Sequence, residues 1–130
     1  MSDDIVVRNA THTDLDGVMD VEKSWPIEMQ APREKFESRL KHFAEGFYVA
    51  LVKGRILGVS TSKIFNYDSK NPPKTWDAAS DEGWITKHDP KGYALYVVSV
   101  GVHKEARGGG IGQRLVEAQK GLVQKLGLQC

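Results

Sequence analysis

The sequence predicts an α/β fold in which strands and helices form layers. Ala94 to Val102 is a nearly continuous β-branched run, which is typical of a strand covered on both faces and predicts a place in the middle of a sheet. A glycine-rich turn joins this run to an amphipathic helix that extends from Ile111 to about Leu126, with Gly127 at its C-cap. Upstream, Lys53-Gly54 separates two apolar runs, as in a two-residue hairpin.

Length and composition fit one globular domain over residues 1–130. Of the 130 residues, 40% are hydrophobic and 27% are charged, and the formal net charge is +1. This balance does not favour nucleic acid or an anionic membrane as a partner, and no apolar run is long enough to span a bilayer. The acidic start, Met-Ser-Asp-Asp, is unlike a signal peptide, and the single cysteine, Cys130, excludes an internal disulfide. We therefore expect a cytoplasmic protein.

The first elements are predicted to be a strand and a helix. Ile5 to Arg8 has the pattern of a short strand. Either Thr11 to Asp14 or Thr13 to Asp16 is a capping box that opens the helix, and Pro26 interrupts it. The residues expected to face inward from this helix are Leu15, Val18, Met19 and Trp25.

A second helix and a hairpin follow. Pro32 marks the helix start, and the helix continues to about Glu45, where Gly46 closes it. The hairpin strands are predicted at Phe47 to Val52 and Arg55 to Ile64. The inward-facing residues of this second helix are Phe36, Leu40 and Phe43.

The segment from Asn66 to Gly92 is too long for an ordinary hairpin connection. It carries Trp76 and Trp84, and Thr75 to Ser80 predicts a short helical turn. Two interpretations stand side by side: a packed lid over a substrate, or a surface excursion that packs on itself.

The turn before the last helix has the composition of an anion cradle. Gly108, Gly109 and Gly110 carry no Cβ that keeps a ligand from the backbone, and glycine adopts positive φ without steric penalty. The unpaired amides and the dipole of a helix N-terminus favour a phosphate group there. A P-loop is excluded because the turn lacks Gly-Lys-Ser/Thr, and a dinucleotide fingerprint fits poorly because the chain ends before an acidic residue for the ribose.

The remaining pattern, Arg-x-x-Gly-x-Gly at Arg107, Gly110 and Gly112, resembles the acetyl-coenzyme A signature of the GNAT (Gcn5-related) N-acetyltransferases. The order strand, helix, helix, strand, strand, strand, helix is similar to that fold. The resemblance implies a mixed, mostly antiparallel sheet flanked by helices. Thr75-Trp76 and His88-Asp89-Pro90 further resemble a subgroup that is sometimes fused to a carbon–nitrogen hydrolase.

The resemblance implies transfer of an acetyl group from acetyl-CoA directly to a primary amine, on a small-molecule or peptide acceptor. It assigns the pantetheine arm and the thioester to backbone groups of Val100 and Val102, with Ser99 beside them. Gly101 stands where the family often has a bulkier residue. The pyrophosphate site carries over onto Arg107, Gly108, Gly109, Gly110, Ile111, Gly112 and Gln113.

The general acid and base are not fixed by the pattern. Tyr96, Ser99 and Glu28 are candidates, each with a structural interpretation beside the catalytic one. Acidic residues that could attract a cationic amine, or simply be solvated, are Glu22, Asp81 and Glu82. The histidines lack metal-ligand spacing and are interpreted as surface or cap residues: His12, His42, His88 and His103. We expect no metal.

The fold that the resemblance implies continues with a fifth strand, of which Leu128-Gln129-Cys130 alone would be present. An uncovered edge would then remain on the strand from Ala94 to Val102, and we expect a homodimer through that edge. The alternatives to an active enzyme are a non-catalytic CoA-binding or interaction domain and an inactive fragment of a larger acetyltransferase.

Overall fold

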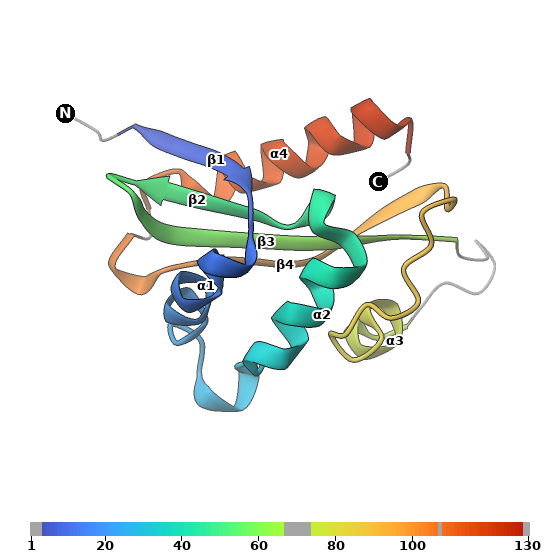
Figure 1. The fold of residues 1–130 in the computed structure, drawn as a ribbon, viewed down its shortest axis with the longest axis horizontal. Helices are drawn as coiled ribbons and strands as arrows, with labels where there is room; N and C mark the ends of the chain where they lie inside the picture. The colour runs from blue at the N-terminus through green and yellow to red at the C-terminus, as the bar shows by residue number, and fades with distance from the viewer. Residues whose placement is uncertain (1–3, 67–73, 107, 129–130) are drawn as a thin grey trace.

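The computed structural model of the chain describes residues 4–66, 74–106 and 108–128. Its centre is a sheet in which neighbouring strands are antiparallel (Figure 1). The strands follow one another in chain order: β1 (Ile5–Asn9), β2 (Tyr48–Val52), β3 (Arg55–Phe65) and β4 (Ala94–Val102). The α/β class and the antiparallel, helix-flanked sheet predicted from the sequence are confirmed.

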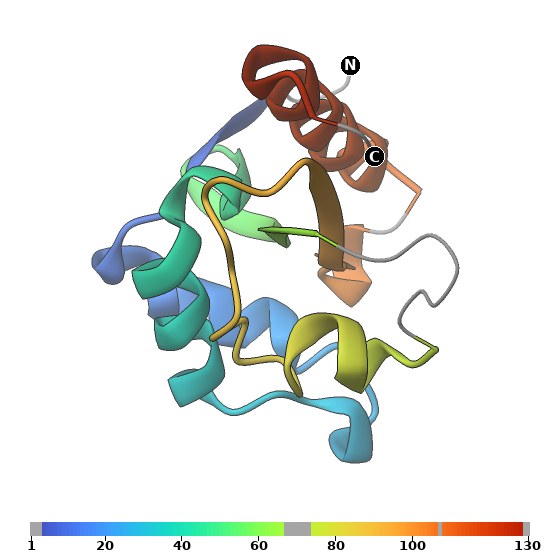
Figure 2. The same ribbon diagram turned by 90° about the vertical axis from the view of Figure 1, so that its right-hand side faces the viewer.

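Helices cover both faces of the sheet (Figures 1 and 2). α1 (Leu15–Glu22) and α2 (Arg33–Phe43) lie on one face, with the short α3 (Trp76–Ser80) on the same side, and α4 (Ile111–Leu126) lies on the other. Short 3-10 turns occur at His12–Asp14, Ile27–Met29, Ala44–Gly46 and Lys104–Ala106. Each predicted helix is therefore present, with ends shifted by a few residues.

The entry to α1 is fixed by the first of the two predicted capping boxes. Thr11 and Asp14 cap each other reciprocally, and the Arg8 guanidinium donates to both carboxylate oxygens of Asp14 at 2.7 and 2.9 Å. These contacts hold the pKa of the Asp14 carboxyl at about 2. Leu15 and Val18 can then pack inward, as predicted, in the cluster between the sheet and helices α1 and α2.

The hairpin between β2 and β3 has the predicted turn. Lys53 and Gly54 both have positive φ, 53° and 79°, which is the backbone of a two-residue hairpin with two left-handed positions. Further along, β3 pairs with β4, and Thr61 faces Ser99 while Ser62 faces Val97, so that Val98 is an extra residue on β4. The bulge bends β4 at its middle.

The described part of the long excursion, residues 74–92, packs against α2 and the sheet. Ile85 is fully buried in a cluster with Phe43. The Trp76 indole donates to the Val98 carbonyl at 2.8 Å, and Ser38 of α2 donates to the Trp84 carbonyl at 2.6 Å. The excursion thus packs on the rest of the fold, and the Thr75 side chain caps the predicted helical turn by accepting from the Ala78 amide.

β4 lies at an edge of the sheet formed by the described residues, so the prediction of a mid-sheet position is wrong. The cause is that composition reports the cover on the two faces of a strand and not on its edges. Gly101 faces Trp25 and Val21 on the α1 side, whereas Val100 and Val102 belong to the cluster under α4.

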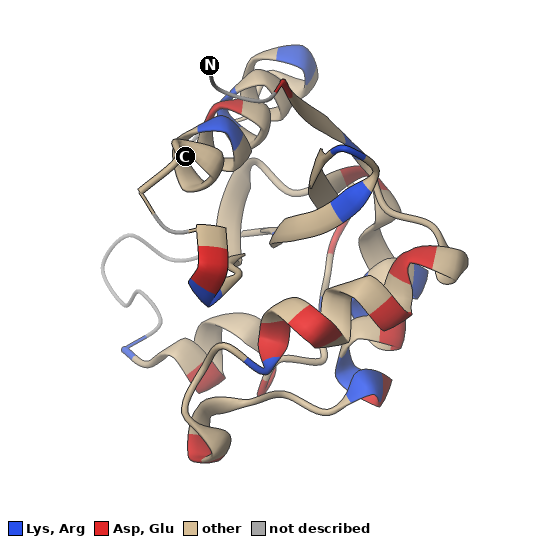
Figure 3. Ribbon diagram, turned by 90° about the vertical axis from the view of Figure 1, so that its left-hand side faces the viewer, with Lys and Arg blue, Asp and Glu red and all other residues tan. Residues whose placement is uncertain are grey.

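Charged positions are mixed over the surface. Figure 3 shows basic and acidic positions close together on α4 and on the helices of the opposite layer. Within the described residues, no helix has the length and apolar character needed to cross a membrane. The same residues contain no cluster of His, Cys, Asp or Glu side chains suited to holding a metal ion.

Candidate functional site

The outer edge of β4 carries free backbone groups at the predicted positions. The His103 amide donates to the Leu57 carbonyl at 2.8 Å, one step beyond the facing pair Val102 and Gly58. Hydrogen-bonded and non-hydrogen-bonded pairs alternate along an antiparallel ladder. The N–H and C=O groups of Val102 and Val100 therefore point away from β3, toward the edge that no described strand covers.

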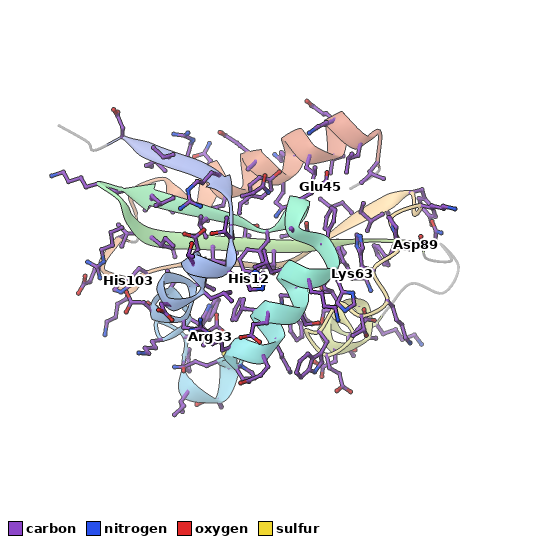
Figure 4. The ribbon with its side chains drawn as sticks, in the orientation of Figure 1. His12, Arg33, Glu45, Lys63, Asp89 and His103 are labelled. Atoms are coloured by element: carbon purple, nitrogen blue, oxygen red, sulfur yellow. The ribbon has the colours of Figure 1, made fainter. Side chains whose placement is uncertain are left out.

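The chain then turns tightly at the end of β4, where Figure 4 labels His103. The Ala106 amide donates to the His103 carbonyl at 2.9 Å, and the Glu105 amide donates to His103 Nδ1 at 3.2 Å. The Lys104 amide donates to the Ser24 hydroxyl at 2.9 Å and ties the turn to the end of α1. Residues 103–106, which precede the glycines, are thus fixed by hydrogen bonds within the turn and by one to Ser24.

The glycines after this turn leave open space above the backbone. Gly108 and Gly110 have φ of +88° and +84°, and a Cβ placed on either would meet nothing within 4 Å. A Cβ on Gly112 would meet only Val102, at 3.6 Å. A ligand can therefore reach the main chain here, and two of the positions require a left-handed conformation that favours glycine.

The start of α4 offers amides to that space. The Arg114 amide makes the first helical bond, to the Gly110 carbonyl at 3.1 Å. The amides of Ile111, Gly112 and Gln113 have no acceptor among the described residues, and the first turn carries no acidic side chain. These donors and the dipole of a 16-residue helix suit a phosphate or pyrophosphate. Arg107, predicted to add charge, lies outside the described residues.

The three catalytic candidates do not gather at one point. Ser99 lies beside Val100 and shares a 2.7 Å hydrogen bond with the Thr61 hydroxyl. Tyr96 is half-buried, and its ring packs edge-on against Phe65 with centroids 5.9 Å apart. Glu28 is exposed in the 3-10 turn between α1 and α2 and makes no contact with a charged or polar group of the described chain. Ser99 is the candidate with a polar neighbourhood.

The acidic residues considered for attracting an amine have different surroundings. Glu22 accepts from the Ala31 amide at 2.7 Å, and burial raises the pKa of its carboxyl. Asp81 is not solvated, because it forms a 2.9 Å ion pair with Lys63 in which both side chains are over nine-tenths buried. Glu82 is exposed. Among the three, Glu22 is thus the residue that lies partly buried on α1 and forms no salt bridge with a described residue.

Two of the histidines differ from the surface interpretation. His103 is buried, and its Nε2 lies 3.4 Å from Asp20 Oδ2. His88 accepts from the Ile64 amide through Nδ1 at 2.9 Å and stacks on Phe43, and burial lowers its pKa. Both histidines bind the backbone of neighbouring turns and strands.

Sequence reasoning missed two residues that shape this region. Gly58 of β3 admits the head of α4, and the signal was an isolated glycine within a strand pattern. Arg39 is 2% exposed on α2, and the signal was its place three residues after Phe36 and four before Phe43, on the stripe assigned to the core.

The chain is similar to known proteins in sequence and in fold. The sequence model of the "Acetyltransferase (GNAT) family" matches residues 14–130. "Probable hydrolase YhcX" of Bacillus subtilis (strain 168) is 37% identical over 126 residues, which are 96% of this chain and 25% of that protein. "Uncharacterized N-acetyltransferase YkwB" of the same organism is 34% identical over 117 residues, 86% of this chain and 52% of that protein. The chain thus spans between a quarter and about half of the length of these relatives.

Among solved structures, the fold is similar to that of the GphF GNAT-like decarboxylase, solved in complex with isobutyryl-CoA. The TM-score is 0.73 at 24% identity, and the match covers 86% of this chain and 55% of that one. The sequence match and the shared fold lead to one conclusion: this chain belongs to the acetyltransferase (GNAT) family.

Proposed function

We propose that this chain transfers an acetyl group from acetyl-CoA directly to a primary amine of a small-molecule or peptide acceptor. The observation that carries the proposal is the open glycine turn from Gly108 to Gly112. Within the described residues, the amides at the head of α4 have no acceptor, and the adjacent edge of β4 has no covering strand. Acyl transfer in general follows from the family. The CoA thioester bound by GphF, a protein of the same fold, supports CoA as the carrier.

In this proposal the backbone does most of the binding. The amides of Ile111, Gly112 and Gln113 hold the pyrophosphate, with Gly108, Gly109, Gly110 and Arg107 beside it. The outward-facing groups of Val100 and Val102 bind the pantetheine arm, and one amide of this edge polarises the thioester carbonyl. Holding donor and acceptor together removes much of the entropic barrier to their reaction.

The reaction needs little from acid–base side chains. The amine nitrogen attacks the thioester carbon, the C–S bond breaks, the sulfur leaves as a thiolate, and the ammonium formed gives its proton to water or a nearby base. A thiol has a pKa of about 8.5, so the leaving group departs without obligatory protonation. Ser99 is the best placed of the candidate side chains to relay a proton, while Tyr96 and Glu28 remain weaker candidates.

Two proposals concern the protein as a whole. We propose that residues 1–130 form one domain and that the protein is cytoplasmic. We further propose that a second copy of the chain covers the β4 edge when no pantetheine arm occupies it. A competing function is a non-catalytic CoA-binding module of a longer protein. One observation favours this function: the chain spans only 25% of YhcX, which is the expected relation of a single module to a longer protein.

A titration followed by a transfer assay separates these functions. Coenzyme A is added to ¹⁵N-labelled protein while the amides of Gly108, Gly110 and Gly112 are followed, and thiol release from acetyl-CoA is then measured with a panel of amines. Binding with thiol release supports the enzyme, and binding without release for any amine supports the module. If the glycine amides do not respond to coenzyme A, both functions are wrong.

A further inference from the structure

Arg39 of α2 is a buried guanidinium with incomplete hydrogen bonding. The residue is 2% exposed, and its side chain lies over the Phe36 ring with 4.6 Å from the guanidinium carbon to the ring centroid. Nε donates to the Gly83 carbonyl at 2.7 Å. Nη1 reaches the hydroxyls of Thr61 and Ser99 only at 3.4 and 3.5 Å, and Nη2 has no acceptor in the part of the chain that the structure describes.

The charge of this group also lacks a direct partner. Burial lowers the pKa of Arg39 to about 10, so the side chain is protonated at neutral pH. Glu22 is the carboxylate whose charge acts on it, but no described carboxylate oxygen lies within ion-pair distance, and Glu22 already accepts from the Ala31 amide. A buried cation without a paired anion is strongly destabilising, which distinguishes Arg39 from a residue kept for stability alone.

The two hydroxyls beside Arg39 lie on the α1 and α2 face of the sheet, and Trp25 lies further along that face. Ser99 and Gly101 lie two residues apart on this face, and the Trp25 indole nitrogen lies 3.3 Å from the Cβ position of Gly101. Trp25 Nε1 has no acceptor among the described residues. Ser99 is only half-buried, whereas Arg39 and Thr61 are buried, so Ser99 is the member of this group that is open to solvent.

The chemistry of these donors selects the ligand. A guanidinium presents its N–H groups in a planar fork that matches the two oxygens of a carboxylate, and hydroxyl and indole donors complete the shell of such an anion. One cation balances one carboxylate, whereas a phosphate dianion would leave excess negative charge in a buried place. The cluster of Arg39, Thr61, Ser99 and Trp25 is therefore suited to a single carboxylate.

We propose that Arg39, with Thr61, Ser99 and Trp25, binds a carboxylate of the substrate on the α1 and α2 face of β4. The inference rests on the proposed acyl transfer for its purpose, and it names the substrate class: the acceptor amine is an amino acid or another amine that carries a carboxylate. A carboxylate on the acyl group of the CoA thioester has the same chemistry, and the test distinguishes these two sources.

The direct test reads the Arg39 side chain itself. The Nε–H resonance of Arg39 is assigned with R39K and followed while sodium acetate is added against sodium chloride at equal ionic strength. α-Amino acids and the matched amines without the carboxylate are then compared, and malonyl-CoA is compared with acetyl-CoA. The amides of Gly110 and Gly112, read in the same spectra, report coenzyme A binding independently.

The site is supported if acetate moves the Arg39 resonance and chloride does not. A saturable shift with amino acids and none with the matched amines places the carboxylate on the acceptor. A larger shift with malonyl-CoA than with acetyl-CoA places it on the acyl group. If no carboxylate moves the resonance, the proposal is wrong whatever the glycine amides show. If the Arg39 resonance responds to a carboxylate but the glycine amides do not shift with coenzyme A, the proposed function is wrong and the carboxylate site is still supported.

Enzyme kinetics provide a second test, because a purely structural arginine would not change KM selectively for one substrate. In R39K, KM for the carboxylate-bearing substrate should rise about tenfold relative to KM for the matched substrate that lacks the carboxylate. Arg33→Lys is the matched control, because Arg33 lies on the same helix but is exposed and paired with Asp16. Circular dichroism of each variant establishes that it folds. Equal losses for substrates with and without the carboxylate would overturn the proposal.

Discussion

Gly58 of β3 lies directly against Ile111, the first residue of α4. A Cβ on Gly58 would come within 2.5 Å of Ile111 Cγ2 and 2.9 Å of Leu115 Cδ1. Ile111 and Leu115 are both buried, so neither side chain has free space in which to move aside. The missing side chain of Gly58 therefore sets how close the head of α4 comes to the sheet, and with it the position of the free amides.

Gly58→Ala should destabilise the fold and weaken coenzyme A binding together. Overpacking at a buried contact costs about 1–3 kcal/mol, and the displaced helix head carries its amides away from the turn. Urea unfolding and a coenzyme A titration measure the two effects. Gly121→Ala on the exposed side of the same helix is the control, and it should stabilise by about 0.5–1 kcal/mol because a Cβ there meets nothing. Unchanged stability in Gly58→Ala would contradict the close approach.

The buried pair between Lys63 and Asp81 should dominate the stability of the excursion over residues 74–92. In Figure 4, Lys63 lies toward the end of β3 that is distant from His103. Asp81→Asn leaves the Lys63 charge without its 2.9 Å partner and should cost about 3–5 kcal/mol in urea unfolding. Asparagine tolerates the left-handed backbone of Asp81, so the loss reports the charge.

The exposed pair between Arg33 and Asp16 is the matched comparison for that experiment. The Asp16 side chain is 88% exposed, so Asp16→Asn should cost less than about 1 kcal/mol. Losses of the same size for Asp16→Asn and Asp81→Asn would show that burial of the Lys63 pair contributes nothing extra.

The capping pair of Arg8 and Asp14 should make stability depend on acid pH. The Asp14 carboxyl has a pKa of about 2 in the folded chain, below its ordinary value, because Arg8 donates two hydrogen bonds to it. Its stabilisation is therefore complete above about pH 4 and is lost as the pH falls toward 2. Since Arg8 is partly exposed, we expect the free energy of unfolding of wild type to exceed that of Asp14→Asn by about 1 kcal/mol at neutral pH. At pH 2 the difference should be small. A gap that is constant with pH would refute this assignment.

The elements with local signals could be predicted from the sequence. The Lys53-Gly54 turn, the Thr11 to Asp14 capping box and the helix from Ile111 to Leu126 each depend on neighbouring residues, and each is present. The long excursion was recognised as an exception, but its packing through Ile85 and Trp76 depends on contacts with α2 and β4 that no local pattern contains.

The sequence could not predict which polar residues would be buried. Arg39 and Lys63 occupy inward positions on a helix and a strand, and burial of a cation depends on what faces it from other elements. The turn from Gly108 to Gly112 was found because its signal is local, whereas Gly58, which sets its height above the sheet, is distant in sequence. The parts of the candidate site that depend on neighbouring residues were thus predicted, whereas contacts between residues distant in sequence were not.

The most direct test of the account compares Gly112→Glu with Gly121→Glu by calorimetric titration with coenzyme A. Both variants place the same carboxylate on α4, at the head of the helix and on its exposed middle, and glutamate in a first turn favours the helix. If the pyrophosphate binds the free amides, Gly112→Glu should bind coenzyme A about tenfold more weakly or not at all, while Gly121→Glu binds as wild type does. Equal affinity of the two variants would contradict the assignment of the glycine turn as the coenzyme A site.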